Sequence, residues 1–503
     1  MSHVNSFEVI APRSKFYQGP FGRLCAALPP WSPPGFDPQN GEAQIIQHFL
    51  TIAKNDMIEM PGMSPTEIAN DNALIAELDN KFGSKIPAGY TYFGQFIDHD
   101  ITFDPASSLM RQNDPNGLLN HRTPRLDLDN VYGKGPDQSP YLYDNNDKDK
   151  MLIGQVAETN LRDLPRNTQG RALIGDMRND ENSMVSQLQL AFLLAHNTLV
   201  DRARDKGMVN PFESARKSLR WLYQYIVWND FLTRVTDKKV HKCALSLEKA
   251  CGGRQTWEMG LSDIYKWKHQ PYMPVEFSVA AYRFGHSMVR NSYQTNAPHR
   301  GFGNFAPIFD NAATDDLRGF KPMTKENVIQ WDWFLEMTTS RGPFPQRARK
   351  IDTKLSNALA ALAEDPNSNS PMNVLAFRNL LRSWRFELPS GSDVAKKFCV
   401  KPTCVEDDRD SLWYYILNEA EKLSGENSGQ RLGSVGSIIV CATFAGLLKG
   451  DPTSWINQSP CWTPDDDVLL NKEDKVDAGD WTLASIIRLS GLPVDGDDVT
   501  AQT

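Results

Sequence analysis

Apolar residues recur at the spacing of amphipathic helices in several long segments of the chain, whereas the two-residue alternation typical of strands is scarce. The clearest segment is DENSMVSQLQLAFLLAHNTLVDRARDKG, in which apolar residues between Val185 and Leu199 share one face. Asp180 or Asn179 is suited to cap the start of this helix, and Gly207 lies where a helix would end. The pattern therefore predicts one long amphipathic helix across this segment.

Other segments carry the same helical pattern, and long polar loops separate them. These segments are residues 42–56, a stretch around 94–100, 214–235, 276–293, 371–385 and 430–449. The loops 105–170 and 291–325 are dense in Asn, Asp, Pro and Gly, which favour turns over regular structure. The sequence predicts a mainly α fold, built as a single large, loop-rich helical domain.

The chain shows no internal repeat and no sharp change in composition that would mark a second domain. Residues 1–40 are rich in Pro and Gly and predict an irregular N-terminal arm. Residues 41–450 carry the helical segments, and we expect residues 451–503 to form a loop-rich C-terminal extension packed on the same domain.

Composition narrows the class of protein further. The 503 residues include 40% hydrophobic and 23% charged residues, with a formal net charge of −8, as in ordinary soluble globular proteins. Without a basic footprint, no nucleic-acid partner is expected. Residues 433–448 are apolar but short and contain Gly, Ser and Thr, so they predict a buried core helix and no transmembrane segment. The first residues lack a cationic start followed by an apolar stretch, so we expect a cytoplasmic location unless a non-classical route exports the protein.

Three titratable residues interrupt an apolar run in YFGQFIDHDITFD. Asp98, His99 and Asp100 lie side by side there, and burying such groups is costly unless each has a partner. On a helix, Gln95 and His99 are one turn apart and share a face, with Asp98 beside them. Asp100 then points elsewhere. We expect Gln95 and His99 to point into a polar cavity. A histidine in a polar cavity binds a metal or exchanges a proton with a substrate.

Two further motifs combine residues of the same chemical types. His286 follows Gly285 on an otherwise apolar helical segment, with Arg283 one turn earlier. Arg178 and Glu181 are three residues apart in GDMRNDEN, at the start of the long helix. Taken singly, a histidine on an apolar face is more often a satisfied core residue, and an Arg–Glu pair at a helix start is usually a surface contact.

Taken together, five motifs in order and spacing resemble those of a known family. They are FGQFIDHDITFD, RTPRLDLDNVYG, GDMRNDEN, YRFGHSMVR and RNLLRSWRFELPSG. They resemble the haem peroxidases of the peroxidase–cyclooxygenase (animal-type peroxidase) superfamily, and most closely its compact microbial members. The resemblance covers about residues 20–450. It implies an animal haem peroxidase fold in which haem b is buried between a distal and a proximal helix.

The resemblance implies a proximal side built around one histidine. His286 matches the ligand of the haem iron, and Asn379 matches the side chain that bonds its other ring nitrogen. Arg382 falls where the family places an arginine against a haem propionate. Arg283 is a plausible second propionate contact, because a guanidinium suits a carboxylate.

On the distal side, the resemblance implies three catalytic residues. His99 matches the histidine that takes a proton from hydrogen peroxide and returns it to the departing oxygen. Arg178 matches the arginine whose positive charge stabilises that oxygen. Gln95 would hydrogen-bond a distal water or an incoming anion. The oxidised haem then takes electrons from a small-molecule donor.

Two carboxylates match positions that form ester bonds to the haem in mammalian members. They are Asp98 and Glu181; the alternative is that both only hydrogen-bond near the haem edge. Where myeloperoxidase has a methionine that forms a sulfonium link, this chain has Asn182. The resemblance therefore makes efficient chloride oxidation doubtful and leaves bromide, iodide, thiocyanate and phenolic donors open.

The family also binds a calcium ion beside the distal histidine, and the matching residues are present. The implied ligands are the side chains of Asp100, Thr123, Asp127 and Asp129 and the carbonyl of Arg125. Oxygen ligands that alternate along a tight loop are those that Ca²⁺ prefers. Without the family, DLD would more often be a solvated turn.

Two other functions remain as alternatives. Fatty-acid dioxygenases and cyclooxygenases of the superfamily use a tyrosine three residues before the proximal histidine; here that residue is Arg283, and Tyr282 points in another direction. A lipid hydroperoxide could still be a peroxidase or peroxygenase substrate. The third possibility is a calcium-stiffened binding protein without turnover. His196 matches a packing residue, and the sequence leaves the donor and the oligomeric state open.

Overall fold

The computed structural model describes residues 21–37, 41–103, 120–249, 255–267, 271–311, 315–362, 369–476, 479–496 and 498. Much of the expected N-terminal arm, part of the loop 105–170 and the last residues of the C-terminal extension lie outside this part of the chain. All of the candidate site residues lie within it.

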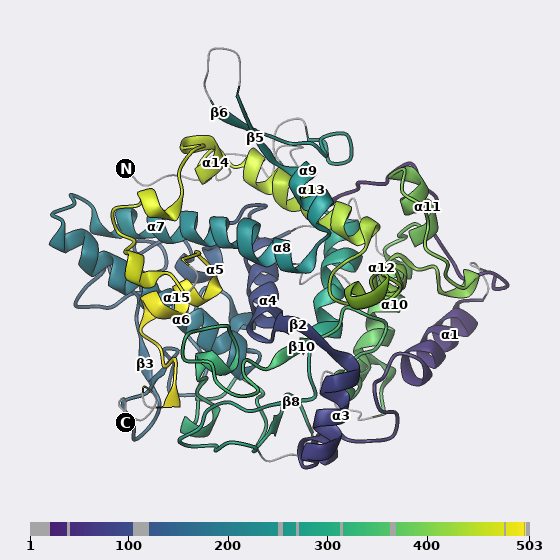
Figure 1. The fold of residues 1–503 in the computed structure, drawn as a ribbon, viewed down its shortest axis with the longest axis horizontal. Helices are drawn as coiled ribbons and strands as arrows, with labels where there is room; N and C mark the ends of the chain where they lie inside the picture. Colours follow the sequence, from purple (N-terminus) through teal and green to yellow (C-terminus); the bar gives the residue numbers. More distant parts are fainter. Residues whose placement is uncertain are drawn as a thin grey trace.

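The described residues confirm the predicted mainly α fold (Figure 1). The α-helices are α1 (Glu42–Asn55), α2 (Pro65–Ala69), α3 (Asn72–Phe82), α4 (Gly89–Ile101), α5 (Asp129–Tyr132), α6 (Ser183–Asp205), α7 (Pro211–Ile226), α8 (Leu232–Val235), α9 (Lys238–Ala244), α10 (Leu375–Arg385), α11 (Gly391–Lys397), α12 (Leu412–Glu421), α13 (Ser434–Gly450), α14 (Trp455–Gln458) and α15 (Leu483–Ser490).

Strands are short and pair only in twos within the described chain. The pairs are β1 (Phe21–Gly22) with β7 (Met273–Pro274), β2 (Gly83–Pro87) with β10 (Arg347–Arg349), β3 (Gly154–Gln155) with β4 (Arg162–Asp163), β5 (Ser246–Lys249) with β6 (Gln255–Glu258), and β8 (Ser292–Tyr293) with β9 (Ala306–Pro307). Only the first pair is parallel. These ribbons connect and brace helices and do not form a sheet core.

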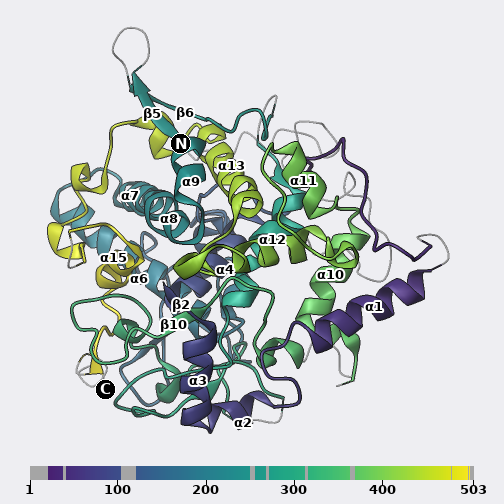
Figure 2. The same cartoon turned by 45° about the vertical axis from the view of Figure 1, so that its right-hand side comes forward.

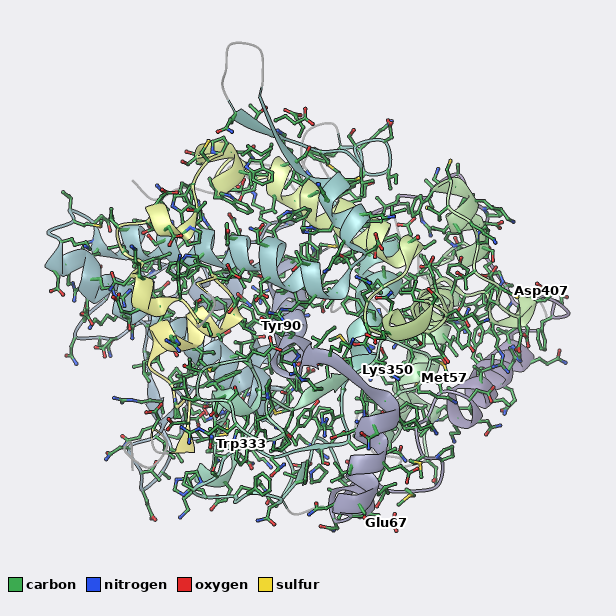
Figure 3. All side chains as sticks on the ribbon, in the orientation of Figure 1. Met57, Glu67, Tyr90, Trp333, Lys350 and Asp407 are labelled. Atoms are coloured by element: carbon green, nitrogen blue, oxygen red, sulfur yellow. The ribbon has the colours of Figure 1, made fainter. Side chains whose placement is uncertain are left out.

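Helix α4 lies in the middle of the molecule (Figures 1 and 2). It packs against α6 and against the segment that carries His286. Ten of its thirteen residues are buried, so its side chains face neighbouring elements on every side. Tyr90, in its first turn, is labelled near the centre of Figure 3. The helix that carries the candidate distal residues is therefore an internal helix.

The long helix α6 begins later than the sequence predicted. Its cap is Asn182, whose side chain accepts from the Val185 N–H, and not Asp180 or Asn179. Those two residues belong to a preceding 3-10 turn, η3 (Met177–Asp180), which Asp176 caps through the Arg178 N–H. A separate turn before the helix was not visible in the hydrophobic pattern. Gly207, with φ of 66°, follows the helix end as expected.

The segment 276–293 is helical over its first part but not as an α-helix. It starts with a π-helical turn, η5 (Glu276–Ala280), and continues as a 3-10 helix, η6 (Ala281–Met288). The buried Glu276 carboxylate anchors the π turn, because it accepts from the Leu24 and Cys25 N–H groups at 3.1 and 2.8 Å. Residues three apart align on a 3-10 helix, so Arg283 and His286 share a face.

Helix α13 confirms the predicted core helix, because all but three of its residues are buried. Among the described residues, no helix is long and apolar enough to cross a bilayer. At the C-terminal end, α15 packs against α6. The Leu483 N–H donates to the Asp230 carboxylate at 3.0 Å, and the same carboxylate accepts from the Tyr90 hydroxyl at 2.6 Å. These bonds connect residues far apart in the sequence to the start of α4.

Candidate functional site

His99 is the buried imidazole of the distal side. It lies in the last turns of α4 with 5% of its surface exposed, and its Nδ1 is 2.7 Å from the Asn179 Oδ1. Burial lowers the pKa of His99 to about 4, and the nearby Arg178 guanidinium adds to the effect. The ring is therefore neutral near pH 7, which is the form that accepts a proton.

Gln95 lies one turn earlier on α4 and contacts the start of α6. Its Nε2 donates to the Glu181 carboxylate at 2.6 Å, and its Oε1 accepts from the Asn182 Nδ2 at 3.1 Å. Since the Asn182 Oδ1 already accepts the capping N–H of Val185, only its Nδ2 can face Gln95. The Gln95 amide is thus oriented with its NH2 group toward Glu181. The sequence alone could not indicate this orientation.

Arg178 lies beside His99 but is held by other groups. Its Nε and Nη2 donate to the two Asp176 carboxylate oxygens at 3.1 and 2.7 Å, and Nη2 also donates to the carbonyls of Thr102 at 2.7 Å and His99 at 3.2 Å. The guanidinium stacks on the Phe103 ring at 4.7 Å. Burial raises the pKa of Asp176, but the guanidinium groups of Arg178 and Arg122 outweigh it and hold that pKa below its usual range. This pairing fixes the position of the Arg178 charge next to the end of α4.

His286 is the corresponding imidazole on η6. Its Nδ1 lies 2.8 Å from the Asn379 amide on α10. Burial lowers the pKa of His286 to about 3, with further lowering by the guanidinium groups of Arg283 and Arg378. A half-turn of the amide lets Asn379 accept from the ring N–H at Nδ1, which leaves Nε2 as a ligand. Sequence and structure thus agree on the pairing of His286 with Asn379.

Several cations lie near His286. Burial lowers the pKa of the Arg283 guanidinium, and Asp98 partly offsets this. Arg378 was not among the predicted residues, although its charge acts on both His286 and Arg283. Arg382 lies one turn after Arg378 on α10, with its guanidinium over the Phe386 ring at 5.4 Å. Half-buried positive charge of this kind favours carboxylate partners.

The distal and proximal elements adjoin each other. Helix α4 packs against η6, and the Asp98 carboxylate interacts electrostatically with Arg283. Asp98 also accepts from the Thr102 hydroxyl at 2.8 Å. A side-chain carbon added at Gly285, which precedes His286, would meet nothing within 4 Å outside its chain neighbours, so there is open space at Gly285. An amide-bonded imidazole, half-buried guanidinium groups and the open space at Gly285 suit a haem with its two propionates.

Three carboxylates converge on the other side of α4. One oxygen from each of Asp100, Asp127 and Asp129 lies within 4.8 Å of the other two. The Thr123 hydroxyl donates to Asp127 at 2.7 Å, and the Tyr223 hydroxyl donates to the Asp100 Oδ2 at 3.1 Å. The Asp100 Oδ1 is buried and has no hydrogen-bond partner. These oxygens are the ligand type that a hard divalent cation requires.

The electrostatics of this cluster also suit a cation. Burial, with repulsion from Asp127, raises the pKa of Asp129 to about 8. Burial and the charges of Asp127 and Asp129 raise the pKa of Asp100 well above its usual value. Arg122 offsets part of this charge by donating to Asp129 at 3.0 Å. The Arg125 side chain lies 3.8 Å from Asp451, and its charge partly offsets the raising of the Asp127 pKa by burial.

Two contacts in the site were not predicted from the sequence. Asn179 is adjacent to Arg178 in GDMRNDEN, but its bond to His99 spans 80 residues. Arg122 precedes the TPRLDLD loop and donates to both Asp129 and Asp176, so it connects the carboxylate cluster to the partner of Arg178. An arginine directly before an acidic loop is a weak signal of such a bridge, because a solvated surface arginine gives the same pattern.

The helical fold places two imidazoles on adjoining elements, α4 and η6. A family model for the animal haem peroxidases matches residues 105–390, more than half of the chain. The chain therefore belongs to the animal haem peroxidase family, and the resemblance seen in the sequence is confirmed. The match begins after α4, so it does not include Gln95 or His99.

Similar proteins were found by sequence and by structure. A peroxidase-like protein of Margaritifera margaritifera is 31% identical over 129 residues, which are 25% of this chain and 15% of that protein. Peroxidase A of Dictyostelium discoideum has a similar structure, with a TM-score of 0.59 at 15% identity, over 95% of this chain and 94% of that chain. A fatty acid α-dioxygenase of Oryza sativa gives a TM-score of 0.53 at 14% identity, over 94% and 81% of the two chains. At these identities the structures establish a shared fold.

Proposed function

We propose that the protein is a haem-dependent peroxidase that reduces hydrogen peroxide and oxidises a small donor, such as bromide, iodide, thiocyanate or a phenol. The observation that carries the proposal is the pair of imidazoles on adjoining elements. His99 and His286 each have Nδ1 beside an asparagine amide, at 2.7 and 2.8 Å. At His99 the asparagine oxygen faces Nδ1, which leaves Nε2 for a substrate proton. At His286 a half-turn of the Asn379 amide gives the same arrangement and leaves Nε2 as a ligand.

His286 would hold the haem iron, with Asn379 fixing its ring. Arg283 and Arg382 would bind the propionates, and the charge of Arg378 supports the same role. When bound, the haem supplies the redox chemistry of the reaction. The protein contributes the orientation of the imidazole, the counter-charges and the exclusion of water.

His99 would act as a general base and then as a general acid. Its neutral Nε2 accepts a proton from one peroxide oxygen and donates it to the other as the O–O bond breaks. Arg178 adds a fixed positive charge beside His99, which stabilises negative charge on the departing oxygen. The Gln95 amide, held by Glu181 and Asn182, offers its remaining N–H to a water or an anion.

Calcium is proposed for the cluster of Asp100, Thr123, Asp127 and Asp129, with the Arg125 carbonyl as a further ligand. The ion would offset the repulsion of three buried carboxylates. Because Asp100 follows His99 directly on α4, such an ion would also fix the end of the helix that carries the base.

The direct test is a donor panel with the haem-loaded protein. We expect oxidation of iodide or guaiacol that depends strictly on hydrogen peroxide. Oxygen uptake with a fatty acid and no peroxide would instead support a dioxygenase. The position three residues before His286 is Arg283, and Tyr282 is stacked on Phe277 with ring centroids 4.7 Å apart. Haem-loaded protein that is inert toward peroxide with every donor would support a binding protein.

Ester bonds between the protein and the haem are proposed at Asp98 and Glu181. Wild-type protein cycled with peroxide should retain its haem in acidified acetone, whereas Asp98→Ala with Glu181→Ala should release it. Mass spectrometry of haem-containing peptides checks the attachment sites. Free extraction of the haem from peroxide-cycled wild-type protein would contradict the esters and leave hydrogen bonds as the role of both carboxylates.

Replacing Asn182 tests the arrangement around Gln95. Asn182→Ala removes the cap of α6 and should cost about 1 kcal/mol in urea denaturation. Asn210→Ala is a matched control, because Asn210 caps a different helix, α7, through the Glu213 N–H at 3.1 Å. Both variants should lose similar stability, but only Asn182→Ala should change the KM for an anionic donor such as iodide. Equal KM changes in both would show that Asn182 acts on stability alone.

A further inference from the structure

A chain of buried side-chain amides runs from His99 to the backbone of α5. The His99 Nδ1 is 2.7 Å from the Asn179 Oδ1, and the Asn179 Nδ2 is 2.7 Å from the Gln189 Oε1. The Gln189 Nε2 then lies 3.4 Å from the Asn130 carbonyl oxygen. Asn179 and Gln189 are both completely buried, with 0% of their surface exposed.

The backbone carbonyl at the end of this chain gives it a direction. A carbonyl oxygen can only accept, so Gln189 must present its NH2 group to Asn130 and its oxygen to Asn179. Asn179 must then present its NH2 group to Gln189 and its oxygen to His99. An oxygen at that position can only accept, so the proton of the neutral His99 ring belongs on Nδ1. The Nε2 is left without a proton.

We propose that Asn179 and Gln189 are positioning residues that select this tautomer of His99. The inference deepens the proposed peroxidase function, because only an unprotonated Nε2 can take a proton from peroxide. The proposal concerns residues that touch neither substrate nor haem. They act through the imidazole, as the carboxylate that holds the imidazole tautomer does in serine proteases.

Burial makes the selection strong. In water, either tautomer of an imidazole finds partners, but here no solvent replaces a lost bond. With the proton on Nε2, Nδ1 would face the Asn179 oxygen as a second acceptor, or both amides would have to turn and leave the Gln189 oxygen against the Asn130 carbonyl. Either alternative leaves a buried polar group unsatisfied. Its cost favours the tautomer with the proton on Nδ1 by roughly tenfold to a hundredfold.

The chain is also braced against α4 itself. The Asn130 Nδ2 donates to the Phe96 carbonyl at 3.4 Å, one turn before His99. The elements α4, η3, α6 and α5 therefore form a closed ring of contacts around the imidazole. Gly175 contributes to this ring, because a Cβ at that position would lie 2.5 Å from the Asn130 oxygen. The buried amides of Asn179 and Gln189 thus connect His99 to the short helix that begins at Asp129.

The test reads the tautomer directly by ¹⁵N NMR of the histidine rings. The protein is loaded with zinc protoporphyrin, which is diamagnetic, and His99→Ala identifies the His99 signals. In wild-type protein we expect a protonated Nδ1 and an unprotonated Nε2. Asn179→Leu and Gln189→Met should convert this to a mixture of tautomers. Gln187→Met is the control, since Gln187 is an equally buried glutamine on α6 that instead contacts the Arg162 carbonyl at 3.4 Å.

A second readout is the rate of reaction of the iron-haem proteins with hydrogen peroxide. Asn179→Leu and Gln189→Met should react roughly two- to fivefold more slowly, in proportion to the lost fraction of the tautomer with an unprotonated Nε2, and Gln187→Met at the wild-type rate. A wild-type ring protonated on Nε2 would overturn the inference. An unchanged tautomer in both Asn179→Leu and Gln189→Met would overturn it as well. The tautomer could respond as expected while neither wild-type protein nor any variant reacts with peroxide. In that case the role of Asn179 and Gln189 is supported and the proposed peroxidase function fails.

Discussion

Replacing His99 with alanine should leave haem binding intact and slow the reaction with hydrogen peroxide by about 100-fold to 10,000-fold, the usual contribution of a general acid–base group. Haem retention is expected because the proposed ligand, His286, lies on a different element and is held by Asn379. The absorbance spectrum reports haem binding, and stopped-flow mixing with peroxide reports the rate.

A second buried histidine supplies the control for this experiment. His196 on α6 is completely buried, with Nδ1 3.0 Å from the Tyr132 hydroxyl and Nε2 2.9 Å from the Asp149 carbonyl. Both ring nitrogens are thus engaged by the protein, as the sequence suggested for a packing residue. His196→Gln should lower the melting temperature and leave the peroxide rate unchanged. Equal rates for wild-type protein and His99→Ala would refute the role assigned to His99.

Removal of the proposed calcium ion should destabilise the protein by more than any single side-chain change at its surface. A ligand present at a thousand times its Kd contributes about 4 kcal/mol to stability. For a chain of 503 residues this corresponds to a fall in melting temperature of roughly 4 °C on chelation. Added Ca²⁺ should restore the lost stability, and Mg²⁺ should restore less, because it does not readily accept a cluster of protein oxygens. Calorimetry with and without a chelator measures the difference.

Asp100→Asn should change the melting temperature in opposite directions with calcium and with a chelator. With calcium, the substitution removes a charged ligand and lowers the melting temperature. With chelator, it removes one of three buried carboxylates that repel each other, while the amide oxygen can still accept from Tyr223, so the melting temperature should rise by a few degrees. Asp71→Asn, at the N-cap of α3, should be neutral in both conditions, since Asn and Asp cap equally well. Identical effects of Asp100→Asn in both conditions would argue against a metal at this site.

Helical periodicity predicted the long elements because burial of one face dominates their formation. The predicted helices at 42–56 and 430–449 correspond to α1 and α13 within a few residues. The pattern did not reveal the π and 3-10 turns of η5 and η6, because these depend on an anchor elsewhere: the Glu276 carboxylate binds backbone N–H groups about 250 residues away in the sequence. The late start of α6 has a local cause, because Asp176 caps the separate turn η3 and Asn182 caps the helix that follows.

Within the candidate site, the motifs predicted residue types better than contacts. The pairing of His286 with Asn379 agreed with the family pattern, and the three carboxylates of the proposed calcium site do converge. Asn179, by contrast, was considered only as a helix cap, and Asn182 only as a substitute for a methionine. Their amides bond to His99 and Gln95, 80 and 87 residues away, and no local pattern encodes such bonds.

The sequence by itself determined the helical class, the family and the chemical identity of the groups at the proposed haem site, because these follow from local periodicity and from residue types in ordered motifs. The tertiary structure alone decided which way each buried amide faces, and so which nitrogen of His99 carries its proton. The physical reason is that hydrogen-bond direction inside a protein is set by the nearest group that can only donate or only accept. At this site those groups are the Asn130 carbonyl and the Val185 N–H.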